Sequence, residues 1–221
     1  MRLRDFLVGW RFLKKEPGYS SVVVFGLSIG FAVSFLLLGY VRYCLSYDSD
    51  VPQSGQIYLV ENKFNLVSKA AWYELTPLPY LEVARQSGLI ASGTPVKTTA
   101  QSPVKVDNHI VPVDLVGVSS DFQPMFGLHA VEGDLDDALS RPDRIAVTES
   151  TARRLFGEPR AVGKSVQINE QSFLIGAVLA DPPANSTLQY QALTALESKA
   201  IWSEDERKFM TGAWANIGAK V

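Results

Sequence analysis

The feature that most constrains this chain is an uncharged run of twenty residues, VVVFGLSIGFAVSFLLLGYV at positions 22–41, which contains no proline. At about 1.5 Å rise per residue, a helix of this length reaches about 30 Å, the thickness of the hydrocarbon core of a bilayer. A buried helix this long in a soluble protein would show a polar face, and this run has none. The sequence therefore predicts a transmembrane helix, which we place at residues 21–43.

A cleaved secretory signal peptide is the main alternative to a retained membrane helix. Signal peptides have an apolar core of about 7–15 residues, followed by small residues at the cleavage site. Here the apolar run is longer, and Arg42 and Tyr43 follow it. The same two residues are too bulky for the position before a lipid-modified cysteine, although Cys44 comes next. We favour the retained helix and keep cleavage or lipidation as alternatives.

Charge is distributed unevenly around the apolar run. The whole chain has a formal net charge of −2, but residues 1–21 carry five basic and two acidic side chains. Positively charged flanks stay in the cytoplasm, which predicts a cytoplasmic N-terminus and an extracytoplasmic chain from about residue 45 onward, at the inner membrane. No basic stripe with interleaved aromatic residues is present, which argues against a nucleic-acid partner.

Residues 1–20 are predicted to form a cytoplasmic amphipathic segment. Apolar side chains recur there at spacings of three and four, with basic residues between them, and Pro17-Gly18 separates the segment from the membrane helix. The apolar positions are Leu3, Phe6, Leu7, Trp10 and Leu13. We expect this face to lie on the inner membrane surface or to contact a cytoplasmic partner.

Small residues recur every four positions within the predicted membrane helix, at Gly26, Gly30 and Ser34. This spacing places them on one face, and small side chains allow a second helix to approach closely. Glycine is also common in membrane helices for other reasons. We nevertheless expect this face to pack against another span or a second protomer.

Residues 157–165, GEPRAVGKS, resemble a nucleotide-binding loop. That loop needs four residues between its glycines, whereas five separate Gly157 from Gly163, and Pro159 has no N–H to offer a phosphate. The preceding residues 149–156 also predict a helix and the following ones a hairpin, which reverses the strand–helix order of a phosphate site. We therefore predict a helix end and a hairpin entry here, with Lys164 solvated.

No other pattern in the sequence indicates catalysis or metal binding. A single cysteine excludes an intramolecular disulfide and a cysteine-based zinc site. His109 and His129 have no second ligand at metal spacing. Asp134, Asp136 and Asp137 lack the glycine and distal glutamate of a calcium loop, so we interpret them as a solvated acidic turn. We predict no catalytic residue, no metal and no cofactor.

Residues 44–221 predict an α+β extracytoplasmic domain with mixed sheets and short helices. Two hairpins are expected, with turns at Asp107-Asn108 and Asn169-Glu170. Further strands are expected at 56–61 and 144–147 and at the C-terminal GAWANIGAKV, and helices at 77–86, 120–126, 134–139 and 149–156. Thr76 and Thr148 are the expected N-caps, and Gly88, Gly127 and Gly157 the expected helix ends. Strands and helices do not alternate regularly, which argues against a Rossmann-type sheet.

The order of several segments resembles a known family. After the membrane helix come LSYDSD and QIYLVE, then GVSSDFQPMFGLHAVEGD, ALSRPDRIAVTESTARRLFGE, VGKSVQIN and ADPPANS. This succession is similar to the N-terminal half of MacB/FtsX-like ABC transporter permeases, which holds the first transmembrane helix and the MacB-type periplasmic core domain. The most specific parts are residues 121–133 and 145–163 taken together. The resemblance covers nearly the whole chain.

The resemblance implies a transport role in which this chain does not hydrolyse ATP. A separate or fused cytoplasmic ATPase would close, and the membrane helices would pass that movement to the outer domain for export, extraction or mechanotransmission. It also implies a homodimer or paired permease and an envelope protein or exported substrate as a further partner. Members of the family handle lipoproteins, antimicrobial peptides, macrolides or cell-wall hydrolases, so the resemblance does not fix a substrate.

The family's permeases carry three more transmembrane helices after the outer domain, whereas these 221 residues contain no second apolar run near twenty residues. We therefore expect the sequence to be part of a longer permease or a truncated homologue. Two other classes stay open. One is a single-span sensor or adaptor whose outer domain binds an envelope ligand or protein, and the other is an anchored envelope enzyme.

Overall fold

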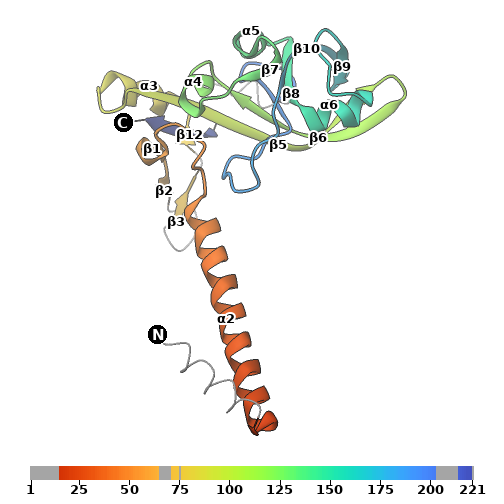
Figure 1. Cartoon of the computed structure of the whole chain (residues 1–221). Helices are drawn as coiled ribbons and strands as arrows, with labels where there is room; N and C mark the ends of the chain where they lie inside the picture. The colour runs from red at the N-terminus through yellow and green to blue at the C-terminus, as the bar shows by residue number, and fades with distance from the viewer. Residues whose placement is uncertain (1–14, 65–70, 75, 203–213, 221) are drawn as a thin grey trace. The chain divides into compact units, whose positions relative to one another are not determined.

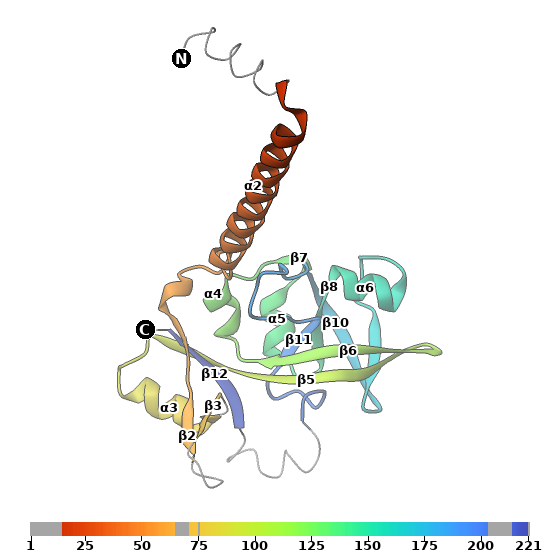
Figure 2. The same ribbon diagram turned by 90° about the horizontal axis from the view of Figure 1, so that it is seen from below.

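The computed structural model describes residues 15–64, 71–74, 76–202 and 214–220. The chain forms two compact units, Met1–Tyr47 and Asp48–Val221. The first unit contains helix α2 (Pro17–Leu45), and the second contains the strands and short helices (Figure 1, Figure 2). The predicted apolar positions of the amphipathic segment, Leu3, Phe6, Leu7, Trp10 and Leu13, lie outside the described residues.

Helix α2 extends beyond the predicted span at both ends. It begins at Pro17, whose missing N–H removes no hydrogen bond in the first turn of a helix and whose fixed φ suits that position. None of its residues is buried. Within the described residues it is the one helix long and apolar enough to cross a bilayer, by the criteria of length and composition. Helix α2 is therefore a candidate membrane span.

The second unit is built on a ten-stranded mixed sheet with the main order β1-β12-β5-β6-β11-β8-β10-β7. Strand β4 pairs with β12, and β9 pairs with both β10 and β5. The strands are β1 Ile57–Leu59, β4 Thr76–Pro77, β5 Ser92–Val106, β6 His109–Val118, β7 Ala130–Gly133, β8 Arg144–Thr148, β9 Ser165–Ile168, β10 Gln171–Leu179, β11 Ala192–Ala195 and β12 Trp214–Lys220. A separate two-stranded sheet joins β2 (Asn62–Phe64) to β3 (Ala71–Tyr73).

Both predicted hairpins are confirmed. Strands β5 and β6 meet at Asp107, which has a left-handed φ of 49°, and they run together as a long ribbon (Figure 1). Strands β9 and β10 turn at Asn169 and Glu170, with φ values of 49° and 62°. Two successive left-handed residues match the twist of the flanking strands. A bulge in β5 at Gln101, with φ of 53°, changes the register between the two halves of the long hairpin.

The short helices lie where the sequence predicts them, with one error in the caps. They are α3 Pro79–Gln86, α4 Phe122–Phe126, α5 Leu135–Ser140 and α6 Glu149–Phe156, with a 3₁₀ turn at Ser54–Gln56. Thr148 caps α6 as predicted, and Gly127 and Gly157 end α4 and α6 in left-handed conformations. Thr76 is not a cap of α3. It lies in β4, where its hydroxyl donates to the Val60 carbonyl at 3.0 Å.

The strands place successive side chains on opposite faces of the sheet, and each face has its own apolar core. One cluster includes Leu115, Ile145, Val147, Leu155, Phe173, Ile175 and Trp202. The other includes Val116, Val118, Phe122, Leu135, Leu139, Ala146 and Leu193. Helix α6 therefore covers the first face, and α4 and α5 cover the second.

Glycine is required at Gly133 for two reasons. Its φ is 82°, and a Cβ at this position would collide with the carbonyl oxygen of Gly176 on the neighbouring strand. Gly163 has nearly the same φ, 84°, but a Cβ added there would have no atom within 4 Å.

We predict that Gly133→Ala destabilises the second unit more than Gly163→Ala does. A left-handed φ alone costs an alanine about 1–2 kcal/mol, and overpacking adds about 1–3 kcal/mol at Gly133. Urea unfolding of the full chain in detergent micelles, followed by near-UV circular dichroism, measures both losses. Equal losses in the two variants would show that the strand contact at Gly133 is not restrictive.

Candidate functional site

The loop that resembles a nucleotide-binding motif uses its backbone donors inside the fold. The N–H of Gly163 donates to the Ile175 carbonyl at 2.9 Å. Lys164 donates its N–H to the Ala161 carbonyl at 3.0 Å. The Lys164 ammonium pairs with Glu158 at 2.5 Å and lies 4.7 Å from the Phe156 ring centroid, in a contact that is open to solvent. This loop offers no free cradle for a phosphate.

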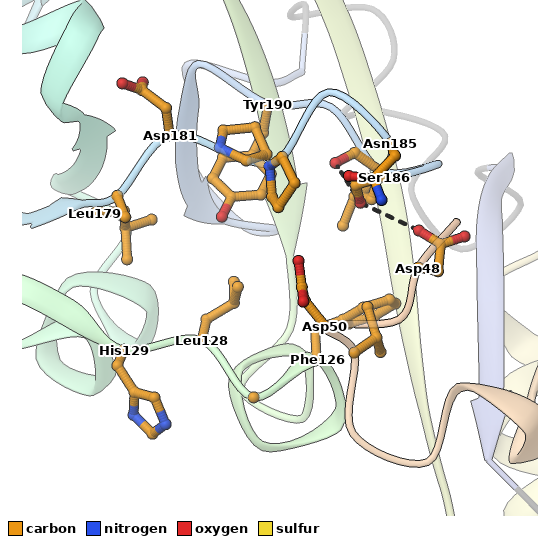
Figure 3. A pocket seen from close by; sticks show the side chains of 16 residues that line it. Asp48, Asp50, Phe126, Leu128, His129, Leu179, Asp181, Asn185, Ser186 and Tyr190 are labelled. Atoms are coloured by element: carbon orange, nitrogen blue, oxygen red, sulfur yellow. Dashed lines mark hydrogen bonds between the residues drawn. The ribbon is translucent and has the colours of Figure 1, made fainter. Parts of the chain in front are cut away.

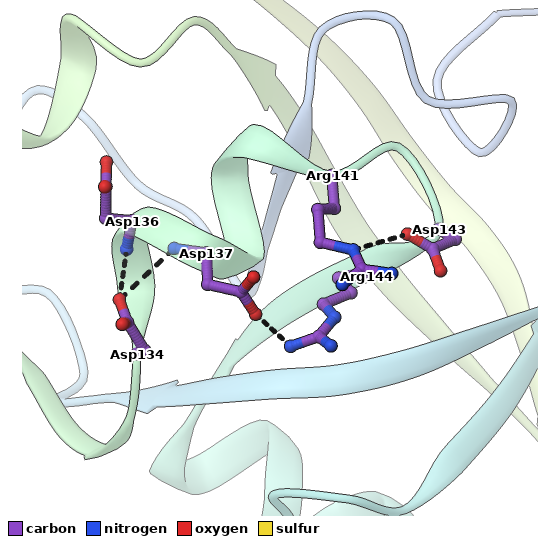
Figure 4. A network of polar contacts seen from close by, with 6 residues as sticks. All are labelled: Asp134, Asp136, Asp137, Arg141, Asp143 and Arg144. Atoms are coloured by element: carbon purple, nitrogen blue, oxygen red, sulfur yellow. Dashed lines mark hydrogen bonds and ion pairs between the residues drawn. The ribbon is translucent and has the colours of Figure 1, made fainter.

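The acidic cluster is exposed to solvent at Asp134 and Asp136, and it also supplies a helix cap and an ion pair. The Asp134 carboxylate accepts the N–H groups of Asp136 and Asp137, at 3.0 and 3.2 Å, and so caps α5. Asp137 in turn pairs with Arg144 of β8 (Figure 4). Within the described residues no group of three or more His, Cys, Asp or Glu is placed to hold a metal ion.

A cleft of about 340 Å³ opens on the second unit between the end of α4 and the loop of residues 180–191 that joins β10 to β11 (Figure 3). Its third wall is the segment that begins at Asp48. A neighbouring hollow of about 480 Å³ shares part of this lining. The residues common to both are Asp48, Val51, Phe126 and Leu188.

Asp48 fixes the beginning of the second unit to this loop. Its backbone N–H donates to the Asn185 carbonyl at 3.0 Å. Its carboxylate accepts the Thr187 N–H at 2.7 Å and the Thr187 hydroxyl at 2.5 Å. It also accepts the Ser186 hydroxyl at 3.2 Å (Figure 3). We call these four hydrogen bonds the Asp48 clamp. Burial alone would raise the pKa of the Asp48 carboxyl, but the hydrogen bonds from Thr187 and Ser186 outweigh it and lower the pKa below the usual value.

Asp181 holds the other end of the same loop. Its carboxylate accepts the N–H and the hydroxyl of Ser150, at 3.3 and 2.5 Å, in the first turn of α6. Burial would raise the pKa of Asp181, but the bonds from Ser150 and Thr148 lower it, and Arg153 adds to that effect. The negative charge also suits the helix N-terminus. Desolvation and the charge of Asp181 raise the pKa of buried Tyr190, which therefore stays neutral.

Among the described residues, neither histidine has a neighbour that indicates metal binding or catalysis. His129 lines the cleft, and His109 is exposed in the β5–β6 hairpin. Asp50 also lines the cleft and has no bonded partner among the described residues. The arrangement holds the loop of residues 180–191 in place. The carboxylates of Asp48 and Asp181, which fix the loop, both accept hydrogen bonds.

Sequence reasoning did not find the Asp48 clamp. The segments LSYDSD and ADPPANS are visible as polar stretches, but their partners lie 138 and 139 residues apart in the chain. No local pattern links an aspartate to hydroxyl groups at that separation. The one available signal is the Pro182-Pro183 pair, which marks a stiff loop without naming its contacts.

The small-residue face of α2 has open space around it in the first unit. No atom lies within 4 Å of a Cβ placed at Gly26 or Gly30, and the Ser34 hydroxyl donates to the Gly30 carbonyl at 2.8 Å. Packing of this face against another helix stays a prediction. At the other end of α2, Tyr43 and Tyr47 form an edge-to-face pair with ring centroids 6.0 Å apart. Tyrosines at this position are typical of the boundary between lipid and water.

Comparisons with known proteins agree with this fold. The family described as MacB-like periplasmic core domain matches residues 20–215. A domain of a permease protein from Porphyromonas gingivalis has a TM-score of 0.62 and 19% identity, and the match covers 78% of this chain and 75% of that one. None of the curated protein sequences is similar enough to count as a match.

Two further solved structures have the same fold. The periplasmic region of MacB from Actinobacillus actinomycetemcomitans has a TM-score of 0.57 and 15% identity, over 80% of this chain and 79% of that one. The extracellular domain of the noncanonic ABC-type transporter YknZ from Gram-positive bacteria has a TM-score of 0.54 and 13% identity, over 75% and 81%.

The lowered pKa of Asp48 predicts how its contribution depends on pH. A carboxyl with a folded-state pKa below its unfolded value of 3.8 stabilises the fold above that value, and this contribution is lost as the pH falls through the folded-state pKa. At pH 7, Asp48→Asn should therefore destabilise the chain by about 1 kcal/mol, because the site is only half-buried.

The difference between wild type and Asp48→Asn should shrink once the pH falls below about 4, since protonated aspartic acid resembles asparagine. Urea unfolding of both proteins at several pH values measures it. A difference that stays constant down to pH 2 would contradict the hydrogen-bonded carboxylate.

Proposed function

Because the chain belongs to the family of MacB-like periplasmic core domains, we propose that it is the N-terminal part of an ABC transporter permease subunit. The observation that carries this proposal is the union, in one chain, of a membrane-length helix and a MacB-like domain. The match begins at residue 20, within α2, so the helix and the domain belong to the same family unit. Such a chain is a membrane-anchored protein with an extracytoplasmic domain.

The charge pattern supports an orientation with the N-terminus in the cytoplasm of a cell with an inner membrane. Basic residues outnumber acidic ones before the apolar run, and Arg42 is the only basic residue close behind it. In this orientation residues 1–20 face the cytoplasm, residues 21–43 cross the membrane and residues 44–221 lie outside. The apolar positions from Leu3 to Leu13 are then available to a cytoplasmic ATPase.

In our proposal this chain changes its conformation during transport and catalyses no reaction itself. A partner ATPase closes on ATP in the cytoplasm, the membrane helices shift, and the outer domain changes its position relative to a substrate or an envelope protein. The charged side chains of the clamp and of the α5 cap support this assignment, because hydrogen bonds and ion pairs already occupy them. A chemical reaction needs reactive groups that are free to meet a substrate.

The proposal is tested by isolating the native protein with its neighbours. An antibody against residues 45–221 is used on detergent-solubilised membranes of the source cell, and the captured material is assayed for ATP hydrolysis and for the size of the antigen. We expect an ABC ATPase subunit, or a fused ATPase domain, to be captured together with ATP hydrolysis. An antigen near 24.3 kDa with no ATPase would overturn the permease proposal and favour a single-span adaptor.

We also propose that Gly26, Gly30 and Ser34 form the contact between α2 and a second membrane helix. Replacing both glycines by leucine should separate the helices, because close approach requires small side chains. Gly39 provides a matched control, since at about 100° per residue it lies on the opposite side of α2.

The expected result is that Gly26→Leu/Gly30→Leu weakens association about tenfold or more, whereas Gly39→Leu does not. Energy transfer between donor- and acceptor-labelled chains in lipid vesicles measures association as a function of the protein-to-lipid ratio. If all three variants associate as the wild type does, the small-residue face is not an interface.

A further inference from the structure

Asp48 stands at the point where the covalent chain enters the second unit. Helix α2 ends at Leu45, and the first unit ends at Tyr47. The chain therefore carries any displacement of α2 to Asp48 within three residues of the helix end. The hydrogen bonds of Asp48 within the second unit determine which residues would be displaced next.

The Asp48 clamp holds three consecutive loop residues at once. One backbone and three side-chain hydrogen bonds join Asp48 to Asn185, Ser186 and Thr187. Three of these involve a charged acceptor, and bonds of that kind are about twice as strong as neutral ones. A clamp with several bonds to adjacent residues resists both translation and rotation of the loop relative to Asp48.

The clamped loop is braced within itself. The Gln189 side chain donates to the carbonyls of Pro183 and Ser186, both at 2.9 Å. The Ser186 N–H donates to the Pro183 carbonyl at 3.1 Å, and Pro182-Pro183 restrict the backbone further. A displacement applied at Ser186 and Thr187 is thus passed along the loop rather than absorbed by it.

The last residue of the loop, Gln191, connects it to the long hairpin. Its carbonyl accepts the Thr148 N–H at 3.0 Å, and its side-chain oxygen accepts the Asp114 N–H at 3.2 Å and the Arg154 guanidinium at 3.1 Å. The Asp114 carboxylate then accepts the N–H of Gln101 at 2.8 Å, at the bulge of β5. The route from the Asp48 clamp to the bulge in the β5–β6 hairpin therefore consists of hydrogen bonds at both ends and of the covalent backbone from Gln189 to Gln191 between them.

We propose that Asp48 is the coupling residue through which movement of α2 reaches the β5–β6 hairpin, by way of residues 180–191. This inference rests on the proposed function, since only a moving membrane helix gives the route something to transmit. Asp48 acts here as a positioning residue. The bulge at Gln101 is the output, because the register of the hairpin changes there.

The test moves α2 without an ATPase. The full chain is reconstituted in phosphatidylcholine vesicles with acyl chains of 14 or 20 carbons, because a change in bilayer thickness alters the tilt of a membrane helix. Hydrogen exchange of the Gln101 amide, resolved by mass spectrometry, is the readout. In the wild type we expect the exchange rate at Gln101 to differ about threefold or more between the two vesicles.

In Asp48→Asn we expect the Gln101 exchange rate to become the same in both vesicles. Asp50→Asn is the matched control, since it removes one charge from the same cleft without touching the clamp, and it should behave as the wild type does. Insertion of Gly-Gly between Tyr47 and Asp48 leaves the clamp intact and should also abolish the difference.

A difference that persists in Asp48→Asn or in the insertion variant would overturn the proposal, and so would its absence in the wild type. The Thr187 amide reports whether the clamp itself is intact. Its exchange should rise about 10- to 100-fold in Asp48→Asn and stay unchanged in the insertion variant. These outcomes are independent of whether an ATPase is captured with the native protein, so the two proposals fail separately.

Discussion

The structure depends first on the solvent that α2 requires. A helix of 29 residues with no buried side chain and no polar face requires apolar surroundings, and its length and composition fit a bilayer. That requirement separates the few residues before it from the domain after it. The covalent chain at Ser46 and Tyr47 connects the two units, and Asp48 is the first residue of the second unit.

In the second unit, very short helices cover a mixed sheet. Helices of five to eight residues contribute little stability of their own, so they depend on caps and packing. Asp134 and Thr148 supply caps, and each face of the sheet supplies an apolar surface. Polar side chains such as Asp181 extend this bracing into the loop of residues 180–191. Hydrogen bonds therefore hold this loop both to Asp48 and to the first turn of α6.

The sequence predicts the features that local chemistry determines. The two hairpin turns, the Thr148 cap and the ends of α4 and α6 follow from residues close together in the chain. Thr76 was wrongly predicted as a cap because its hydroxyl bonds to another strand. The cap at Asp134 and the ion pair of Asp137 with Arg144 were not predicted, because the acidic residues alone do not name these partners.

Local sequence patterns also do not predict the topology of the sheet. Strand β11 lies parallel to β6, and β12 lies between β1 and β5, although nothing in their short apolar patterns specifies these neighbours. The Asp48 clamp joins positions 138 and 139 residues apart, so only the folded chain reveals it. The candidate site therefore was outside the reach of local sequence patterns, whereas the family resemblance depended on segment order and could be recognised.

The direction of the pKa shifts at Asp48 and Asp181 agrees with a structural role for both carboxylates. General acids and bases work with carboxyl groups whose pKa is raised toward neutrality and whose oxygens are free to exchange protons. At Asp48 and Asp181 the pKa is lowered, and their oxygens accept hydrogen bonds from the loop and from α6. Such groups stay charged across the physiological range and hold their partners constantly. Constant attachment is what force transmission needs, and it is the opposite of what proton transfer needs. The clamp is thus suited to holding the loop of residues 180–191 in place.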